Sequence, residues 1–334
     1  MLLLGTDERF LEHDTGPGHP ERPARLRAVE AGMASSDAAH EPRARLELRS
    51  ATRAEVERVH TAEHLDDLER CCRAGGGRID ADTVASRGSW DAALLAAGAG
   101  LAAVDALDAG QGDAAFLALR PPGHHAVPAH AMGFCLINNV AVTAAALAAR
   151  GERVLVVDWD AHHGNGTQEI FYESPDVMYA SLHEWPLYPG TGRVTDTGRG
   201  AGAGTTVNVP LPAGATGDVY LEAFDTLIAP LAERFTPDWV LISSGYDAHR
   251  DDPITGLGLS AGDFTDLTAR VGALAPTAGR LIVFLEGGYD LDALQGGVEA
   301  TCAVLEGRSV RPEPATSGGP GGTAVAKARA EHGL

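Results

Sequence analysis

The segment 158–162 places two aspartates and a histidine at alternate positions: Asp158, Asp160 and His162. Side chains two residues apart on an extended strand point to the same side, so a carboxylate and an imidazole can hold one ion together. Asp247, which follows a different predicted strand, would supply a third ligand. Carboxylate oxygen and imidazole nitrogen bind Zn²⁺ in proteins, and three protein ligands leave one position open for water. The pattern predicts a catalytic site for one Zn²⁺-like ion.

Two adjacent histidines, His124 and His125, follow two prolines and a glycine. This rigid turn cannot belong to a central strand, and it places both imidazoles at the edge of the turn. Asp158 and Asn165 are available to fix the tautomer and charge of each ring. The pair is therefore a candidate for acid–base catalysis beside the metal, the alternative being two exposed loop histidines.

Tyr289 follows two glycines, Gly287 and Gly288, after the last predicted strand. A tyrosine at such a place is ordinarily an amphipathic residue at a rim. Beside a metal, its hydroxyl could instead donate a hydrogen bond to an oxyanion. We interpret Tyr289 as a candidate donor to a transition state.

The segments that carry these residues all follow predicted strands. Aliphatic runs predict strands at 114–119, 154–158, 177–182, 205–209, 239–243 and 281–285. Helices are predicted at 90–109, 139–149, 219–235 and 261–275, with two more at 23–33 and 52–73. Strands that alternate with helices pair in parallel, and their carboxyl ends share the edge where such folds bind ligands. We expect a three-layer α/β fold, with helices on both faces of a mostly parallel central sheet.

The predicted strands and helices follow one another over most of the chain. No linker interrupts it, so we expect a single catalytic domain over residues 1–310. The remaining segment, 311–334, contains the sequence SGGPGG and a polar end. Because such a segment buries little apolar surface, we expect it to be a mobile tail.

Composition and charge exclude several function classes. The 334 residues carry 26 Lys and Arg against 46 Asp and Glu, a formal net charge of −20, which disfavours nucleic-acid binding. No stretch has the roughly 18 to 20 uninterrupted apolar residues of a membrane span, so we expect no membrane partner. The four cysteines have no framework spacing, which suits a reducing cytoplasm, where we expect the protein to act.

Six motifs in order give the sequence a resemblance to the histone deacetylase family. The sequence is most similar to the class II-like bacterial branch of deacetylases and acetylpolyamine amidohydrolases. The motifs, between His13 and Leu305, are RPPGHHA, GFCLINN, DWDAHHGNGT, SLHEWPLYPGTG, SSGYDAH and EGGYD. The resemblance implies the arginase–deacetylase fold.

The resemblance also implies a role for each residue of the site. The zinc ligands fall on Asp160, His162 and Asp247. The tandem histidines fall on His124 and His125, and the transition-state tyrosine on Tyr289. Asn165 stands where some relatives have aspartate, so His125 is expected to be held less readily as imidazolium.

Two further sites are implied by the resemblance alone. A narrow acyl-lysine tunnel is expected to be lined by Gly133, Phe134, Trp185, Gly287 and Gly288. A structural K⁺ is expected at Asp158, Asp160, His162, Ser181 and Leu182.

The implied reaction is removal of acetyl or other acyl groups from acylated amines by metal-activated water. His125 is the expected general base, with His124 as an electrostatic partner oriented by Asp158. Acetyl-lysine side chains are the expected substrates. Ile254, at the tunnel rim, offers apolar contact and no carboxylate for the second cation of an acetylpolyamine, which is the alternative substrate.

Two other functions are alternatives. A dinuclear ureohydrolase of the arginase type shares the fold, but its motif needs a carboxylate where this chain has Gly164. A non-catalytic scaffold of deacetylase shape would be expected to lose a metal ligand, a tandem histidine or the tyrosine. None of these is missing from the sequence.

Overall fold

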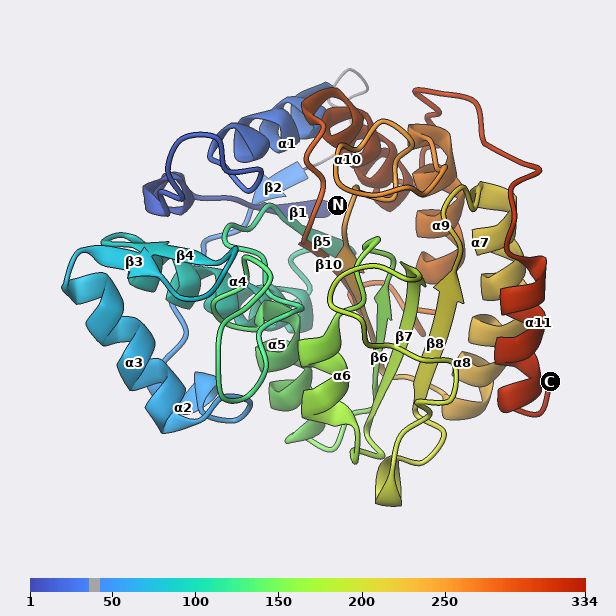
Figure 1. The fold of residues 1–334 in the computed structure, drawn as a ribbon, viewed down its shortest axis with the longest axis horizontal. Helices are drawn as coiled ribbons and strands as arrows, with labels where there is room; N and C mark the ends of the chain where they lie inside the picture. The colour runs from blue at the N-terminus through green and yellow to red at the C-terminus, as the bar shows by residue number, and fades with distance from the viewer. Residues whose placement is uncertain (36–42) are drawn as a thin grey trace.

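The computed structural model describes residues 1–35 and 43–334, and within them eight strands form one parallel sheet (Figure 1). The strand order is β2-β1-β5-β10-β9-β6-β7-β8. The strands are β1 (Leu2–Gly5), β2 (Arg43–Arg45), β5 (Ala114–Leu117), β6 (Val154–Asp158), β7 (Val177–Glu184), β8 (Thr206–Leu211), β9 (Trp239–Ser244) and β10 (Leu281–Leu285). A separate antiparallel hairpin consists of β3 (Gly76–Arg78) and β4 (Val84–Ser86).

The six strands predicted from the sequence correspond to β5 to β10, with ends that agree within two residues. The prediction missed β1 and β2, which pair with each other at one side of the sheet. Both are short, with four and three residues, and two of the three residues of β2 are arginines. Their strand conformation is set by pairing with β5 and β1 rather than by a long apolar run.

Helices cover both faces of the sheet. They are α1 (Ala24–Ser35), α2 (Arg53–Val56), α3 (Ala62–Arg73), α4 (Ser89–Asp108), α5 (Asn139–Ala148), α6 (Asn165–Phe171), α7 (Gly217–Ala223), α8 (Ala229–Phe235), α9 (Ala261–Gly272), α10 (Leu291–Leu305) and α11 (Gly322–Glu331). The helices α1, α10, α9 and α7 pack in a row on one face, and α4, α5 and α6 on the other (Figure 1). The three-layer α/β fold expected from the sequence is confirmed.

Two predicted helices are interrupted. The segment 52–73 forms α2 and α3, because Thr61 begins a new helix by accepting a hydrogen bond from the backbone N–H of His64. The segment 219–235 contains a π-helical turn, Phe224–Ile228, between α7 and α8. These changes lie away from the sheet edge where the predicted site residues gather.

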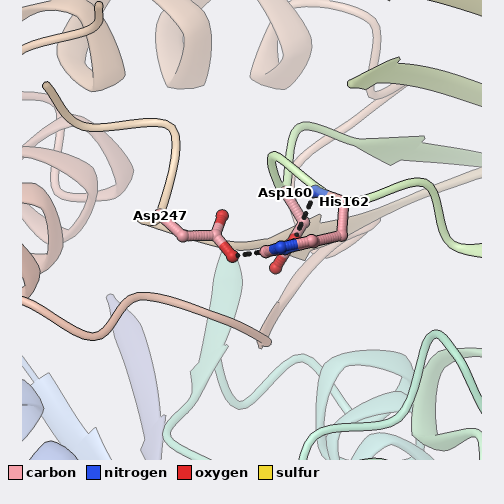
Figure 2. Close-up of side chains that lie close together, drawn as sticks. All are labelled: Asp160, His162 and Asp247. Carbon is pink, nitrogen blue, oxygen red and sulfur yellow. Dashed lines mark hydrogen bonds and ion pairs between the residues drawn. The ribbon is translucent and has the colours of Figure 1, made fainter. Parts of the chain in front are cut away.

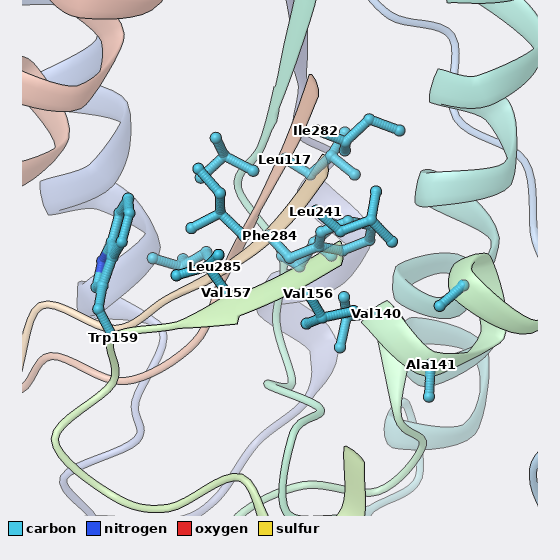
Figure 3. Close-up of a cluster of buried hydrophobic side chains, with 14 of the residues drawn as sticks. Leu117, Val140, Ala141, Val156, Val157, Trp159, Leu241, Ile282, Phe284 and Leu285 are labelled. Atoms are coloured by element: carbon cyan, nitrogen blue, oxygen red, sulfur yellow. The ribbon is translucent and has the colours of Figure 1, made fainter. Parts of the chain in front are cut away.

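The core lies between the sheet and the helical layers, and Figure 3 shows part of it. All residues of β5, β6 and β9 are buried. Side chains from neighbouring strands, such as Val156, Leu241 and Phe284, are fully covered. Strands buried on both faces are what a parallel sheet between two helical layers requires.

The longest described helix, α4, is apolar along most of its length. By length and composition it could cross a membrane, but 78% of its most apolar window is buried inside the protein. A Cβ atom on Gly98 would overlap the backbone of Arg49, and one on Gly100 would overlap Thr143 and Phe284. The helix therefore packs as a core element, and its composition follows from that position.

The C-terminal segment 311–334, expected to be a mobile tail, contains one further helix. Residues 322–331 form α11, which packs against β8 and α7 and buries Val325 and Ala328 completely. The preceding Gly- and Pro-rich stretch is held by hydrogen bonds: Gly318 N–H donates to Asp218, and Gly319 N–H donates to Thr216 Oγ1. Hydrogen bonds from the backbone of this stretch, and not apolar burial, connect it to the rest of the protein.

The register of the central strands brings the polar segments together. Asp158 at the end of β6 lies opposite Ser181 of β7 and Ser243 of β9. Ser244 lies opposite Leu285, so Glu286 and its neighbours leave β10 at the same edge. The motifs that follow these strands therefore converge at the carboxyl edge of the sheet.

Candidate functional site

Asp160, His162 and Asp247 face one another at this edge (Figure 2). The Nδ1 atom of His162 lies 3.0 Å from Asp247 Oδ2 and 3.2 Å from Asp160 Oδ1. One ligand atom of each residue lies within 4.8 Å of the other two, and all three residues are buried. The structure thus brings together the three residues expected to bind a metal.

Backbone hydrogen bonds fix the two carboxylates. Asp160 Oδ1 accepts from the N–H of His162 at 2.9 Å, and Asp247 Oδ1 accepts from the N–H of Ala161 at 2.8 Å. Gly287 N–H donates to Asp160 Oδ2 at 2.8 Å, and a Cβ atom on Gly287 would overlap the carboxylates of both aspartates. A glycine is therefore required at 287, because any side chain would fill the space beside the carboxylates.

The electrostatics of the cluster favour a cation. Burial and the nearby charge of Asp160 raise the pKa of Asp247 to about 7. Burial opposes ionisation of His162, but its contacts with Asp160 and Asp247 outweigh burial and raise its pKa well above the ordinary value. Two carboxylates buried this closely require a compensating positive charge. The donor set of two carboxylates and one imidazole fits a Zn²⁺ site with an open position.

The tandem histidines have separate partners. His124 Nδ1 lies 2.9 Å from Asp158 Oδ2, which also accepts a 2.9 Å hydrogen bond from Tyr179 Oη. His125 Nδ1 donates to Asn165 Oδ1 at 2.8 Å. Since the amide oxygen can only accept, the proton of neutral His125 is on Nδ1, and Nε2 keeps a lone pair.

The two rings also differ in charge. Burial opposes the charged form of His124, but Asp158, Asp160 and Glu286 outweigh burial and raise its pKa to about 10. A cation held by Asp160 would lower the pKa from that value. Burial, together with positive charge on His124 and His162, holds the pKa of His125 well below its ordinary value. His125 is therefore suited to accept a proton and His124 to carry one.

Glu286, the first residue of the EGGYD motif, is a site residue that our sequence reasoning missed. It is fully buried, and its carboxylate accepts from the N–H groups of Gly123 at 2.7 Å and His124 at 3.2 Å. Its other oxygen accepts from Ser243 Oγ at 3.1 Å. Glu286 thereby ties the turn of the tandem histidines to β9 and β10.

Arg25 of α1 was also missed. It is 1% exposed, and it donates to the carbonyl oxygens of Glu286 and Gly288, both at 2.6 Å. Its Cζ atom lies 5.0 Å from the centre of the Tyr289 ring. No local pattern marks this arginine, because its partners are more than 260 residues away in sequence.

A cavity of about 220 Å³ lies beside these groups. Its lining comprises Asp82, His125, Gly133, Phe134, His162, Leu187, Tyr188, Ile254 and Tyr289. Phe134 lies on one side, with its ring centre 5.8 Å from that of Tyr289. A larger depression of about 620 Å³ beside α6 includes Asn165 but none of the three clustered metal-ligand candidates.

The second aromatic residue at the cavity is Tyr188, whereas Trp185 was the one expected. Trp185 is not among the residues that line the cavity, and its backbone N–H donates to Leu211 O of β8 at 2.7 Å. Tyr188, three residues later, lines the cavity, and its ring centre is 5.2 Å from that of His125. The same motif therefore supplies an aromatic residue to the cavity, at position 188 instead of 185.

The remaining predicted residues lie around the cavity. Gly133 has φ +57°, and a Cβ atom there would overlap the ring of His125. Gly288 has φ +120° and lies behind the site against Tyr246. The expected K⁺ residues Ser181 and Leu182 are buried in β7, and Ser181 Oγ lies 2.9 Å from His183 Nδ1.

Asp82 is an acidic lining residue that was not among the predicted site residues. It lies in the loop between β3 and β4 and lines the same cavity as Tyr188 and Ile254. Burial and the neighbouring Asp80 carboxylate raise the pKa of Asp82 above its ordinary value. The mouth of the cavity therefore combines apolar side chains with one carboxylate.

Comparisons with known proteins agree with this geometry. A family model described as "Histone deacetylase domain" matches residues 19–305. The chain is 42% identical over 293 residues to "Probable deacetylase" from Archaeoglobus fulgidus, which covers 85% of this chain and 80% of that protein. It is 42% identical over 288 residues to "Histone deacetylase-like amidohydrolase" from Pseudomonas aeruginosa, which covers 84% of this chain and 75% of that protein.

One plant relative and one solved structure extend the comparison. The chain is 40% identical over 319 residues to "Histone deacetylase 15" from Arabidopsis thaliana, covering 93% of this chain but only 57% of that relative's length. The solved "Crystal Structure of HDA15 HD domain" matches with a TM-score of 0.89 and 38% identity, covering 99% of this chain and 94% of that one. This likeness confirms the predicted arginase–deacetylase type of fold.

Proposed function

The chain belongs to the histone deacetylase family, and we propose that it is a zinc-dependent amidohydrolase that removes acetyl or other acyl groups from acylated amines. The observation that carries the proposal is the shared position of His125, His162 and Tyr289 on one narrow cavity. A base, a metal ligand and a hydroxyl donor on one cavity are the parts that hydrolysis of an amide requires.

We propose that Asp160, His162 and Asp247 hold one Zn²⁺, on the strength of their mutual distances and burial. Bound there, Zn²⁺ would supply Lewis-acid chemistry, lowering the pKa of water and polarising the amide carbonyl. A structural K⁺ at Asp158, Asp160, His162, Ser181 and Leu182 is part of the same proposal, supported by the burial of these residues beside one another.

The proton transfers belong to the tandem histidines. The free Nε2 of His125 accepts a proton from the attacking water and later delivers it to the leaving amine nitrogen, so the products are a carboxylic acid and a free amine. His124, held by Asp158, supplies positive charge next to His125, with 4.1 Å between the two ring centres.

Tyr289 is the proposed donor to the oxyanion. Burial raises the pKa of its phenol well above the ordinary value, even though Arg25 beside its ring acts in the other direction. The hydroxyl therefore stays protonated and can donate as negative charge develops on the substrate oxygen. Arg25 and the backbone of the 286–289 loop hold the ring in place.

Acetyl-lysine side chains are the proposed preferred substrates, and acetylpolyamines are a second candidate. Ile254 and Tyr188 are each 37% exposed at the cavity and offer apolar contact to a lysine stem. Asp82 favours the second candidate, because its carboxyl on the same cavity could pair with the ammonium group of a polyamine.

The alternatives are less well supported. A dinuclear site would need a carboxylate at Gly164, but a Cβ atom there would overlap Asp158 and Tyr179 Oη. A non-catalytic scaffold would have no need for the buried His125–Asn165 and His124–Asp158 pairs beside the metal-binding cluster.

The direct test is a substrate panel on the purified protein. Acetyl-lysine peptides, acetylspermidine and longer acyl-lysine peptides are supplied, and release of free amine is followed. The proposal expects hydrolysis that a hydroxamate blocks. Turnover that a hydroxamate and metal removal leave unchanged would contradict it.

A further inference from the structure

The C-terminal segment 311–319 contacts the loop that carries a metal ligand. This segment follows the part of the chain that the family model matches, residues 19–305. It runs along α9, where Ser260 Oγ donates to Pro314 O at 2.7 Å and Thr316 Oγ1 donates to Asp263 Oδ2 at 2.7 Å. A Cβ atom on Gly262 would overlap the backbone of Glu313, so α9 and the C-terminal segment are in close contact.

Glu313 connects this segment to the loop 247–254. Its Oε2 atom lies 2.6 Å from Nε2 of His249 and accepts from the N–H of Ala261 at 2.9 Å. Its Oε1 atom pairs with Arg250. His249 is 3% exposed and stands two residues after Asp247.

His249 in turn shapes the turn that reaches Tyr289. Its Nδ1 atom accepts from the N–H of Asp251 at 3.2 Å, and its carbonyl accepts from the N–H of Asp252 at 3.0 Å. Asp252 Oδ2 then accepts from the N–H of Tyr289 at 2.8 Å. A continuous series of hydrogen bonds therefore leads from Glu313 to the backbone of Tyr289.

His249, Asp251 and Glu313 lie close enough together to suggest a second cation site. Their contacts favour a different role. Both ring nitrogens of His249 already have partners, and Arg250 compensates the charge of Glu313. These three residues therefore connect the C-terminal segment to the loop 247–254 through hydrogen bonds and an ion pair.

We propose that Glu313 is a positioning residue, through which the C-terminal segment holds the 249–252 turn and thereby the Tyr289 backbone. The kinetic consequence rests on the proposed function, since it requires Tyr289 to act in the reaction. The structural consequence does not. Removing the Glu313 carboxylate should loosen 249–252 and 286–290 together, although Glu313 lies outside the cavity.

Hydrogen exchange of the whole protein tests the structural part without any activity. Glu313→Ala should speed amide exchange roughly tenfold in peptides covering 247–254 and 286–290, because a charge-assisted hydrogen bond shifts a local opening by about that factor. Glu313→Gln should stay close to wild type, since an amide oxygen can still accept from His249 and Ala261. Exchange at 286–290 that is unchanged in Glu313→Ala would overturn the proposal.

Arg311→Ala is the matched control. Arg311 pairs with Asp266 of α9, so its loss also weakens the docking of the segment, but it has no contact with the 249–252 turn. Amide hydrogen exchange at 286–290 in Arg311→Ala should match wild type. Equal acceleration in Arg311→Ala would mean that the segment acts only through general docking, which contradicts a specific role for Glu313.

Kinetics test the link to Tyr289. Glu313→Ala should lower kcat roughly 5- to 50-fold with KM changed by less than about twofold, because the donor is misplaced while the cavity is kept. The Tyr289→Phe protein has no hydroxyl to position. In that background, Glu313→Ala should have no further effect on kcat. A full additional loss in that background would overturn the proposal. A wild type with no amidohydrolase activity would refute the proposed function, and the exchange result would still decide the role of Glu313.

Discussion

Asn165 Oδ1 accepts a hydrogen bond from His125 Nδ1 at 2.8 Å, so the neutral ring presents Nε2 to the cavity. The partner is uncharged, and the pKa of His125 is held well below its ordinary value by burial and by positive charge on His124. An aspartate at 165 would keep the hydrogen bond and add a negative charge.

Asn165→Asp should therefore raise the pKa of His125, because the added negative charge favours the protonated ring. A base must be unprotonated to act, so the acid limb of the kcat/KM profile should move to higher pH. The measurement is kcat/KM from pH 5 to 9 for both proteins. An acid limb that does not move would remove His125 from the role of base.

Tyr289→Phe should lower kcat by roughly 10²- to 10³-fold, because the hydroxyl donates to an oxyanion that forms only after water attacks. The ring and its contact with Arg25 are kept, so the fold and KM should change little. Steady-state kinetics and a thermal melt measure the two effects. Unchanged kcat with a raised KM would make Tyr289 a ground-state binding residue.

Arg25→Lys should reduce kcat by about tenfold without loss of bound metal. Lysine keeps the charge but cannot donate to the Glu286 and Gly288 carbonyls in the fork geometry of a guanidinium. Arg27→Lys, at an exposed position of the same helix, is the control and should match wild type. Equal kcat in Arg25→Lys and wild type would show that the 286–289 loop holds Tyr289 unaided.

Asp82→Asn should reduce kcat/KM for acetylspermidine about tenfold more than for an acetyl-lysine peptide with no added positive charge. The change removes the one carboxylate among the described lining residues of the cavity. A tenfold effect is the size expected for losing one charge-assisted contact to the ammonium group of the substrate. Ile254→Glu should act in the opposite direction. Glu173→Gln removes a charge outside this cavity and should leave selectivity unchanged. Equal losses for both substrates in Asp82→Asn would remove Asp82 from substrate selection.

The parts of the site that could be predicted are those carried by strand ends. Asp158, Asp160 and His162 leave β6 in one short run, and Asp247 follows β9, the neighbouring strand. Apolar runs identify the strands, and parallel pairing then brings their ends together. The geometry of the predicted ligands follows from local spacing and strand order.

The parts that could not be predicted depend on contacts distant in sequence or on loop direction. Arg25 reaches Gly288 from the first helix, and nothing in its own segment indicates that partner. Tyr188 lines the cavity where Trp185 was expected, because which aromatic of a loop reaches a cavity depends on the path of that loop and not on its composition. The C-terminal segment is docked by backbone hydrogen bonds and by two buried side chains, Val325 and Ala328, which are too few to show as an apolar pattern.

The account depends most on a single catalytic metal held by Asp160, His162 and Asp247. The measurement is metal content by elemental analysis, alongside activity, for wild type, the chelator-treated protein and Asp247→Ala. The account predicts about one zinc per chain in the active wild type, loss of metal and activity together in the other two, and recovery on adding Zn²⁺ to the chelated wild type only. Full activity in protein shown to contain no metal would contradict it.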